Sequence, residues 1–110
     1  MNLFKIYLEK IKKSINKNKK LIGSISSDDL SLIVIESPPD KFNYDLSSNA
    51  AMVLSKIIKE NPRMIAEKLK NIFEKEINDF SEISIAGPGF LNFKFSLKTW
   101  FKITENIFKT

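Results

Sequence analysis

The residues of this chain best suited to chemistry stand at two-residue spacing after a glycine-rich turn. Gly87-Pro88-Gly89 predicts a sharp reversal, because proline presets φ at about −65° and glycine accepts dihedrals that other residues avoid. A strand is expected to follow over residues 90–95, with side chains alternating between its two faces. Phe90, Asn92 and Lys94 then share one face, and the apolar residues between them share the other.

An aromatic ring, an amide and an ammonium group on one strand face suit the recognition of an unpaired RNA base. Phe90 offers a surface for stacking, Asn92 a hydrogen-bond donor and acceptor for the base edge, and Lys94 a partner for phosphate. A structural alternative stays open. Phe90 would then cover the edge of the core, and Asn92 and Lys94 would form the solvated side of an edge strand.

Composition argues against catalysis by this chain. It has no cysteine and no histidine, which removes thiolate chemistry and the usual zinc, iron and copper ligand sets. Asp28, Asp29 and Asp40 stand next to expected turns and helix starts, where carboxylates ordinarily cap backbone N–H groups. No serine has a histidine to activate it. We therefore expect no catalytic residue and no metal site.

The charge of +5 at pH 7 is carried almost entirely by lysine, because Arg63 is the only arginine among 18 basic residues. Lysine attracts phosphate as a point charge without the planar fork of arginine, so a lysine-rich surface supplies salt-sensitive affinity. Lys12 and Lys13, on a helix expected near the N-terminus, are candidates for a ridge that faces phosphates. The alternative is an ordinary solvated helix face.

Hydrophobic periodicity predicts an α+β fold in a single domain spanning residues 1–110. The order α-β-β-α-α-β-β-α indicates a two-layer α/β sandwich, with helices on one face of a mainly antiparallel four-stranded sheet. The last helix is expected to bury Leu97, Trp100, Phe101 and Phe108. The expected helices are 3–18, 49–59, 61–78 and 97–108, and the expected strands are 30–36, 42–46, 83–86 and 90–95.

The chain carries no secretory signal pattern, because lysines are spread through its first twenty residues. No apolar run approaches the length that crosses a bilayer. We expect a cytoplasmic protein without a membrane partner.

Three ordered motifs resemble one known family. The segment Ala86-Gly-Pro-Gly-Phe-Leu-Asn-Phe93 resembles the signature that closes the N-terminal additional domain of arginyl-tRNA synthetases. Asp45-Leu-Ser-Ser-Asn-Ala-Ala-Met52 and Asn61-Pro-Arg-Met-Ile-Ala-Glu67 resemble two earlier segments of that domain. The resemblance covers essentially all 110 residues. Tyr44 departs from it, because the family usually has glycine there, and Asn43 replaces the usual histidine or phenylalanine.

The resemblance implies a tRNA-binding module that performs no bond chemistry. In that family, the domain packs against the outer corner of tRNA and contacts D-loop bases. The contacting aromatic residue corresponds to Phe90, its amide partner to Asn92, and Gly87 stands at a turn position that is polar in some relatives. The implied partners are arginine-specific tRNA and a catalytic domain of the same polypeptide.

The class I signature motifs of the family are absent from these residues, so this chain is not expected to activate arginine. The implied parent protein is an arginine-tRNA ligase, and its ATP and Mg²⁺ would belong to the catalytic domain, leaving this chain without a cofactor. Two other functions stay open: a protein-interaction or scaffold domain that uses the same strand face, and a free-standing tRNA-binding protein.

Overall fold

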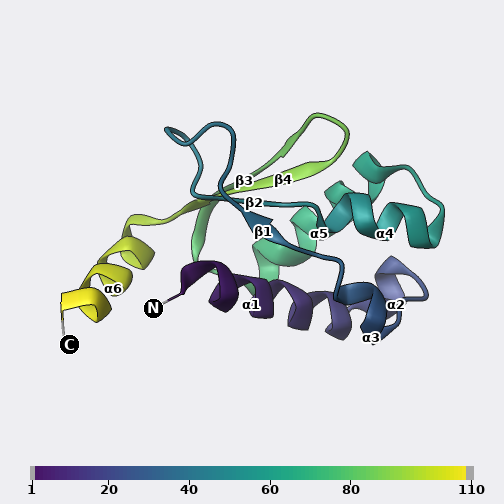
Figure 1. Cartoon of the computed structure of the whole chain (residues 1–110), viewed down its shortest axis with the longest axis horizontal. Helices are drawn as coiled ribbons and strands as arrows, with labels where there is room; N and C mark the ends of the chain where they lie inside the picture. The colour runs from purple at the N-terminus through teal and green to yellow at the C-terminus, as the bar shows by residue number, and fades with distance from the viewer. Residues whose placement is uncertain (1, 109–110) are drawn as a thin grey trace.

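The computed structural model of the chain describes residues 2–108, and the side chains of residues 107 and 108 are not described. Figure 1 shows a small antiparallel sheet with most of the helices gathered below it. The elements in chain order are α1 (Leu3–Lys17), α2 (Lys19–Ile22), α3 (Ser27–Leu30), β1 (Ile35–Glu36), β2 (Leu46–Ser48), α4 (Ala50–Ile58), α5 (Pro62–Glu76), β3 (Phe80–Ala86), β4 (Phe90–Phe95) and α6 (Leu97–Phe108).

The sheet confirms the predicted fold class. Its four strands lie in the order β1-β2-β4-β3, and every neighbouring pair is antiparallel. The predicted succession of α and β elements is also present, with two one-turn helices, α2 and α3, added after α1. Strand β4 lies between β2 and β3, so both of its edges are hydrogen-bonded. The strand that carries the candidate site is therefore internal to the sheet, not an edge strand.

One face of β4 belongs to the core. Leu91 and Phe93 are fully buried, as the predicted alternation requires. The Phe93 ring lies 6.1 Å from that of Phe73 in α5 and 4.8 Å from that of Phe80 in β3, measured between centroids. Helix α5 thus covers this face and leaves the opposite face of the sheet for the site.

The first two strands are shorter than predicted and lie later in the chain. A strand was expected over 30–36, but Leu30 ends the one-turn helix α3, which a capping box between Ser26 and Asp29 begins. Only Ile35 and Glu36 pair in β1. The second strand was expected over 42–46, but β2 begins at Leu46, because residues 40–44 form a turn in which the Tyr44 N–H donates to the Asp40 carbonyl.

The expected core face of α6 is largely wrong, although its predicted bounds are confirmed. Leu97 and Phe101 are 76% and 68% exposed, and Trp100 is only half-buried, with its ring edge against Phe95. Phe108 lies outside the residues whose side chains are described. Figure 1 explains the result, because α6 extends away from the other helices at one end of the molecule. Thr99 and Ile103 are the buried residues of α6 instead, so the helix packs on the domain through a different face from the predicted one.

Asp79 joins three parts of the fold, because it lies between α5 and β3. Its carboxylate accepts hydrogen bonds from the Tyr7 hydroxyl at 2.6 Å and from Lys10 Nζ at 3.0 Å, both in α1. Its backbone carbonyl accepts from the Thr99 hydroxyl of α6 at 2.7 Å. The position of Asp79 therefore ties both terminal helices to the start of the last hairpin.

Candidate nucleic-acid interface

The turn between β3 and β4 has the backbone that the Gly-Pro-Gly pattern predicts. Gly87 and Gly89 adopt positive φ values of 56° and 142°, a region that favours glycine. A Cβ on Gly89 would lie 3.1 Å from Pro62 Cβ, so the turn packs closely against the start of α5. Arg63 Nη1 also donates to the Gly87 carbonyl at 2.6 Å. The turn is thus held by the first residues of α5.

The register of the sheet places the three candidate residues of β4 in successive rows of its outer face. Phe90 lies opposite Ala86, and Lys94 lies opposite Glu82, both in β3. Phe90 is 38% exposed and the Lys94 side chain is exposed. An aromatic ring and an ammonium group are therefore available on one face, as predicted.

Asn92, which lies between them, is not exposed as predicted. Its side chain is only 7% exposed, and its Oδ1 atom has no hydrogen-bond partner among the described residues. Its cross-strand neighbours are Ser47 in β2 and Ser84 in β3. Serine side chains are too short to cover an amide, so another group on this face must shield it.

Tyr44 is that group. Its hydroxyl donates to Glu82 Oε2 at 2.5 Å, although Tyr44 precedes β2 and Glu82 lies in β3, on the far side of β4. The hydrogen bond with Glu82 raises the pKa of the Tyr44 phenol, and Ser84 is a second polar neighbour of that phenol. The ring therefore extends across the face of β4 beside Asn92.

All three motifs of the sequence support this strand. The Asp45 N–H donates to the Phe93 carbonyl at 2.8 Å, and Asp45 Oδ2 accepts from the Phe95 N–H at 2.9 Å. The motif over residues 61–67 begins α5, where Asn61 caps the helix by accepting from the Arg63 N–H at 2.8 Å. Since Arg63 in turn holds the Gly87 turn, the three segments converge on β4.

The structure does not bring Lys12 and Lys13 to this face. Both lie on α1, below the sheet in Figure 1, whereas the tip of the β3–β4 hairpin lies above it. Lys13 borders a surface hollow of about 470 Å³ between α1 and the end of α5. Lys12 and Lys13 also border a second hollow beside α3. Neither hollow is lined by a hairpin residue.

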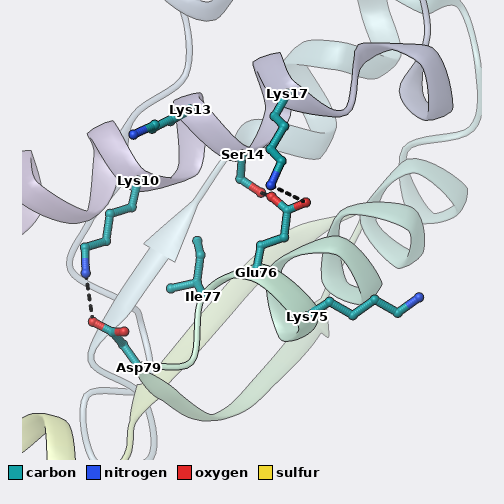
Figure 2. Close-up of a pocket in the computed structure, with 8 residues that line it drawn as sticks. All are labelled: Lys10, Lys13, Ser14, Lys17, Lys75, Glu76, Ile77 and Asp79. Carbon is teal, nitrogen blue, oxygen red and sulfur yellow. Dashed lines mark hydrogen bonds and ion pairs between the residues drawn. The ribbon is translucent and has the colours of Figure 1, made fainter.

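The first hollow mixes lysines with carboxylates (Figure 2). Lys10 pairs with Asp79 at 3.0 Å, and Lys17 approaches Glu76 to 3.9 Å. Within residues 2–108, Lys13 and Lys75 form no ion pair. Two of the four lysines are thus matched by carboxylates, which weakens the attraction of this hollow for a phosphate group.

Hydrogen bonds hold both carboxylates of the hollow in the ionised form. Asn18 and Ser14 donate to Glu76 and lower the pKa of its carboxyl group. Partial burial acts to raise the pKa of Asp79, but the hydrogen bonds from Tyr7 and Lys10 and nearby lysine charges outweigh it, so that pKa is lowered. Burial and the bond to Asp79 raise the pKa of the Tyr7 phenol. Both carboxylates therefore stay ionised at neutral pH.

The described residues contain neither a candidate metal cluster nor a membrane-spanning helix. No group of three or more carboxylate, histidine or cysteine side chains there is placed to hold a metal ion. No helix in residues 2–108 is both long enough and apolar enough to span a bilayer.

Two residues of the interface were not identified as site residues from the sequence. Tyr44 was noted only as a departure from a family pattern, and Arg63 only as the single arginine. Their roles depend on contacts with residues 38 and 24 positions away. The one available signal was position in the sequence, because Arg63 lies within one of the three motifs and Tyr44 directly precedes another.

Comparisons with known proteins agree with this arrangement. The family model described as arginyl tRNA synthetase N terminal domain matches residues 5–95. Arginine-tRNA ligases from Bartonella tribocorum and Pelagibacter ubique are 42% and 39% identical over 101 and 108 residues, which cover 91% and 97% of this chain. An arginine-tRNA ligase from Geobacillus kaustophilus is 40% identical over 93 residues, or 84% of the chain.

The chain spans only 17% to 18% of the length of these relatives. The matched part includes all three motifs and the whole four-stranded sheet. The chain therefore belongs to the family of arginyl-tRNA synthetase N-terminal domains.

Proposed function

We propose that this chain is the tRNA-binding module of an arginine-tRNA ligase. It docks on the outer corner of arginine tRNA at the D-loop and positions the tRNA for arginylation by a catalytic domain of the same polypeptide. The chain itself performs no bond chemistry. The family membership supports this proposal, and the open face of β4 provides the surface for it.

The observation that carries the proposal is the exposure of Phe90 on an internal, well-supported strand. The half-exposed ring of Phe90 gives an unpaired base a surface to stack on, and Lys94, four residues further along the same face, is a cationic partner for the RNA backbone. Asp45 holds the backbone of β4, and Arg63 and Pro62 hold the preceding turn, so the ring is presented on a rigid support. Such support lowers the entropy that binding must overcome.

In this proposal, Lys12 and Lys13 act at a distance. They lie on another side of the molecule from Phe90, so they attract the RNA through the overall positive charge without contacting the same nucleotide. Gly87 contributes backbone shape at the turn. ATP and Mg²⁺ serve the catalytic domain, and this module needs no cofactor of its own. The module acts in the cytoplasm, where tRNA is aminoacylated.

The test is a titration of an arginine tRNA transcript against the parent chain and a Phe90→Ala variant over a series of salt concentrations. A transcript with a changed D-loop and a Phe42→Ala variant are the controls. Phe42 is fully exposed and lies on a different loop, so Phe42→Ala removes an aromatic ring from another part of the surface.

The proposal expects Phe90→Ala and the changed D-loop each to weaken binding by about 1 to 3 kcal/mol at every salt concentration. Phe42→Ala should bind the RNA with the parent affinity. Equal binding by the Phe90→Ala variant, or binding that disappears entirely with salt, would reduce the interaction to general lysine–phosphate attraction and would refute base recognition by β4.

A second surface favours a protein contact, as the interaction-domain alternative requires. Leu97 and Phe101 expose apolar side chains on α6, beside the half-buried Trp100. Exposed apolar patches of this kind mark contact sites, and we assign this one to the catalytic domain of the same polypeptide. In that longer protein, a Leu97→Ser, Phe101→Ser double variant should loosen the domains in limited proteolysis. If the double variant is cleaved at the same rate as the parent, α6 does not form the contact between the domains.

A further inference from the structure

Helix α6 presents a buried side and an exposed side. Thr99 and Ile103 are buried against the domain, whereas Leu97 and Phe101 are exposed. Residues two apart in a helix point in nearly opposite directions, because each residue turns the chain by about 100°. Residues 104–106, which follow Ile103, are all exposed. The domain therefore holds α6 along one short side near its start and leaves the opposite side free.

The start of α6 is fixed to Asp79 by a set of hydrogen bonds. The Asp79 carbonyl accepts from the Ser96 N–H at 3.0 Å and from the Thr99 hydroxyl at 2.7 Å. Ser96 Oγ accepts from the Thr99 N–H at 3.2 Å, which caps the first turn of α6. The two hydroxyl oxygens lie 2.9 Å apart, so the Ser96 hydroxyl donates to that of Thr99, whose own proton goes to Asp79. We call Asp79, Ser96 and Thr99 the α6 joint.

Asp79 is itself held in place by the rest of the domain. Its carboxylate accepts hydrogen bonds from the Tyr7 hydroxyl and from Lys10 Nζ, both in α1. The centroid of the Tyr7 ring lies 4.9 Å from that of Phe95, the last residue of β4. The Phe95 ring meets the edge of Trp100 in α6, with 5.3 Å between centroids. The α6 joint therefore links the direction of α6 to both α1 and β4.

Thr99 uses its hydroxyl differently from Thr104, which lies in the same helix. The Thr104 hydroxyl donates to the Trp100 carbonyl at 2.8 Å, the usual bond of a helical threonine to the carbonyl four residues earlier. The Thr99 hydroxyl instead reaches Asp79, 20 positions earlier in the chain. Among the α6 side chains that the structure describes, no other donates a hydrogen bond outside the helix and its cap. An apolar side chain could be buried equally well at position 99, so the hydroxyl contributes direction and not burial.

We propose that Thr99 is a positioning residue that sets the direction of α6, and so holds the tRNA-binding face at a fixed angle to the catalytic domain. The inference rests on the proposed function, in which Leu97 and Phe101 contact the catalytic domain and β4 contacts tRNA. One side of α6 then carries the contact, and the opposite side carries the α6 joint. A tRNA bound at β4 reaches the catalytic domain in the correct orientation only while the α6 joint is intact.

The first test measures the direction of α6 in this chain through residual dipolar couplings of its backbone amides. Thr99→Val keeps the shape of the side chain and removes the hydroxyl, whereas Thr99→Ser keeps the hydroxyl. Thr104→Val is the matched control, because it removes a hydroxyl that bonds only within α6. The couplings of the sheet and the melting temperature show for each variant that the domain is folded.

In the parent, the couplings of α6 and of the sheet should fit a single alignment tensor, because the two move as one body. In Thr99→Val, the α6 couplings should fall below the values that the sheet tensor requires, because the helix then samples a range of directions. Thr99→Ser and Thr104→Val should behave as the parent. If the parent requires two tensors, or if folded Thr99→Val fits one, Thr99 does not set the direction of α6. The parent result decides by itself should Thr99→Val not fold.

The second test measures arginylation of arginine tRNA by the longer protein that contains this chain. Thr99→Val should lower kcat about tenfold, since less of the bound tRNA is correctly oriented, and Thr99→Ser should restore it. The affinity of the chain itself for arginine tRNA should not change, because Thr99 lies in α6 and not in β4. A general loss of structure would instead weaken tRNA binding as well, and would contradict a positioning role.

The outcomes separate this inference from the proposed function. If Thr99→Val loosens α6 but arginylation stays as in the parent, the direction of α6 does not matter to the reaction, and only this inference fails. If the parent chain does not bind arginine tRNA, the proposed function fails, and the role of the α6 joint in arginylation fails with it. The dipolar couplings still decide in that case whether Thr99 sets the direction of α6.

Discussion

At the scale of single residues, Asn92 best shows how a contact across strands changes the meaning of a sequence pattern. Alternation places Asn92 correctly on the outer face of β4, with Leu91 and Phe93 on the inner face. It does not show that Tyr44, 48 positions earlier in the chain, lies over that face. The amide is buried, and its oxygen has no donor among the described residues.

Removing one charge at Asp79 should give a pH-dependent loss of stability. The pKa of Asp79 in the folded chain is below its ordinary value of 3.8, so its ionised form stabilises the fold above that pH and loses this effect as the pH falls. An Asp79→Asn variant should unfold more easily at pH 7, by about 1 kcal/mol, since the group is partly exposed to solvent.

Urea denaturation between pH 7 and pH 3 checks this prediction. The difference in unfolding free energy between parent and variant should shrink as the pH passes below 3.8. A Lys98→Gln variant is a suitable control, because Lys98 is exposed and is not part of the Asp79 hydrogen-bond network. A difference that stays constant over this pH range would contradict the role given to the carboxylate.

At the scale of elements, the β3–β4 hairpin is defined by its contacts with the start of α5. The turn, the cap at Asn61 and the proline after it were all predictable, because each depends on residues adjacent in sequence. The bond from Arg63 to the Gly87 carbonyl and the contact of Gly89 with Pro62 were not, because they join segments more than twenty positions apart.

The two glycines of the turn should respond differently to substitution by alanine. A Cβ on Gly89 would lie 3.1 Å from Pro62 Cβ and 3.2 Å from the Pro62 carbonyl oxygen, whereas a Cβ on Gly87 would have no atom within 4 Å. Gly89→Ala should therefore destabilise the chain by about 2 to 3 kcal/mol, and Gly87→Ala by about 1 kcal/mol through φ alone. Chemical denaturation of the two variants measures both values, and equal losses would contradict the packing argument.

The difference between local contacts and contacts between distant segments also explains which predicted elements were wrong. The apolar run before β1 resembles a strand, but the capping box at Ser26 and Asp29 makes its first residue helical. In α6 the amphipathic pattern correctly predicts a helix with an apolar face. It cannot specify which surface covers that face, and Leu97 and Phe101 remain exposed in this domain.

At the scale of the whole molecule, the lysines of α1 and the candidate site on β4 occupy different surfaces. The lysines of α1 lie below the sheet, and Phe90, Asn92 and Lys94 lie on its outer face. A single nucleotide therefore cannot contact both groups. In the proposed function, overall charge attracts RNA at long range and β4 selects the nucleotide that is bound.

Lysine substitutions should separate these two contributions. Lys94→Gln should lower the magnitude of the slope of log affinity against log salt concentration by about 1, because one phosphate contact is lost. It should also weaken binding at every salt concentration tested. A Lys12→Gln, Lys13→Gln double variant should weaken binding chiefly at low salt, since those residues do not touch the bound base. Salt-series titrations measure both slopes, and identical behaviour of the two variants would contradict the separation of surfaces.

RNA binding by the outer face of the sheet is tested most directly by an NMR titration of the isotope-labelled chain with arginine tRNA. If the sheet face binds RNA, the backbone amide signals of β4 and the adjoining turn should shift or broaden first and most strongly. Signals of the outer face of α1 should change little at physiological salt. If the amide signals of α1 shift first and those of β4 do not change, the sheet face is not the RNA-binding surface.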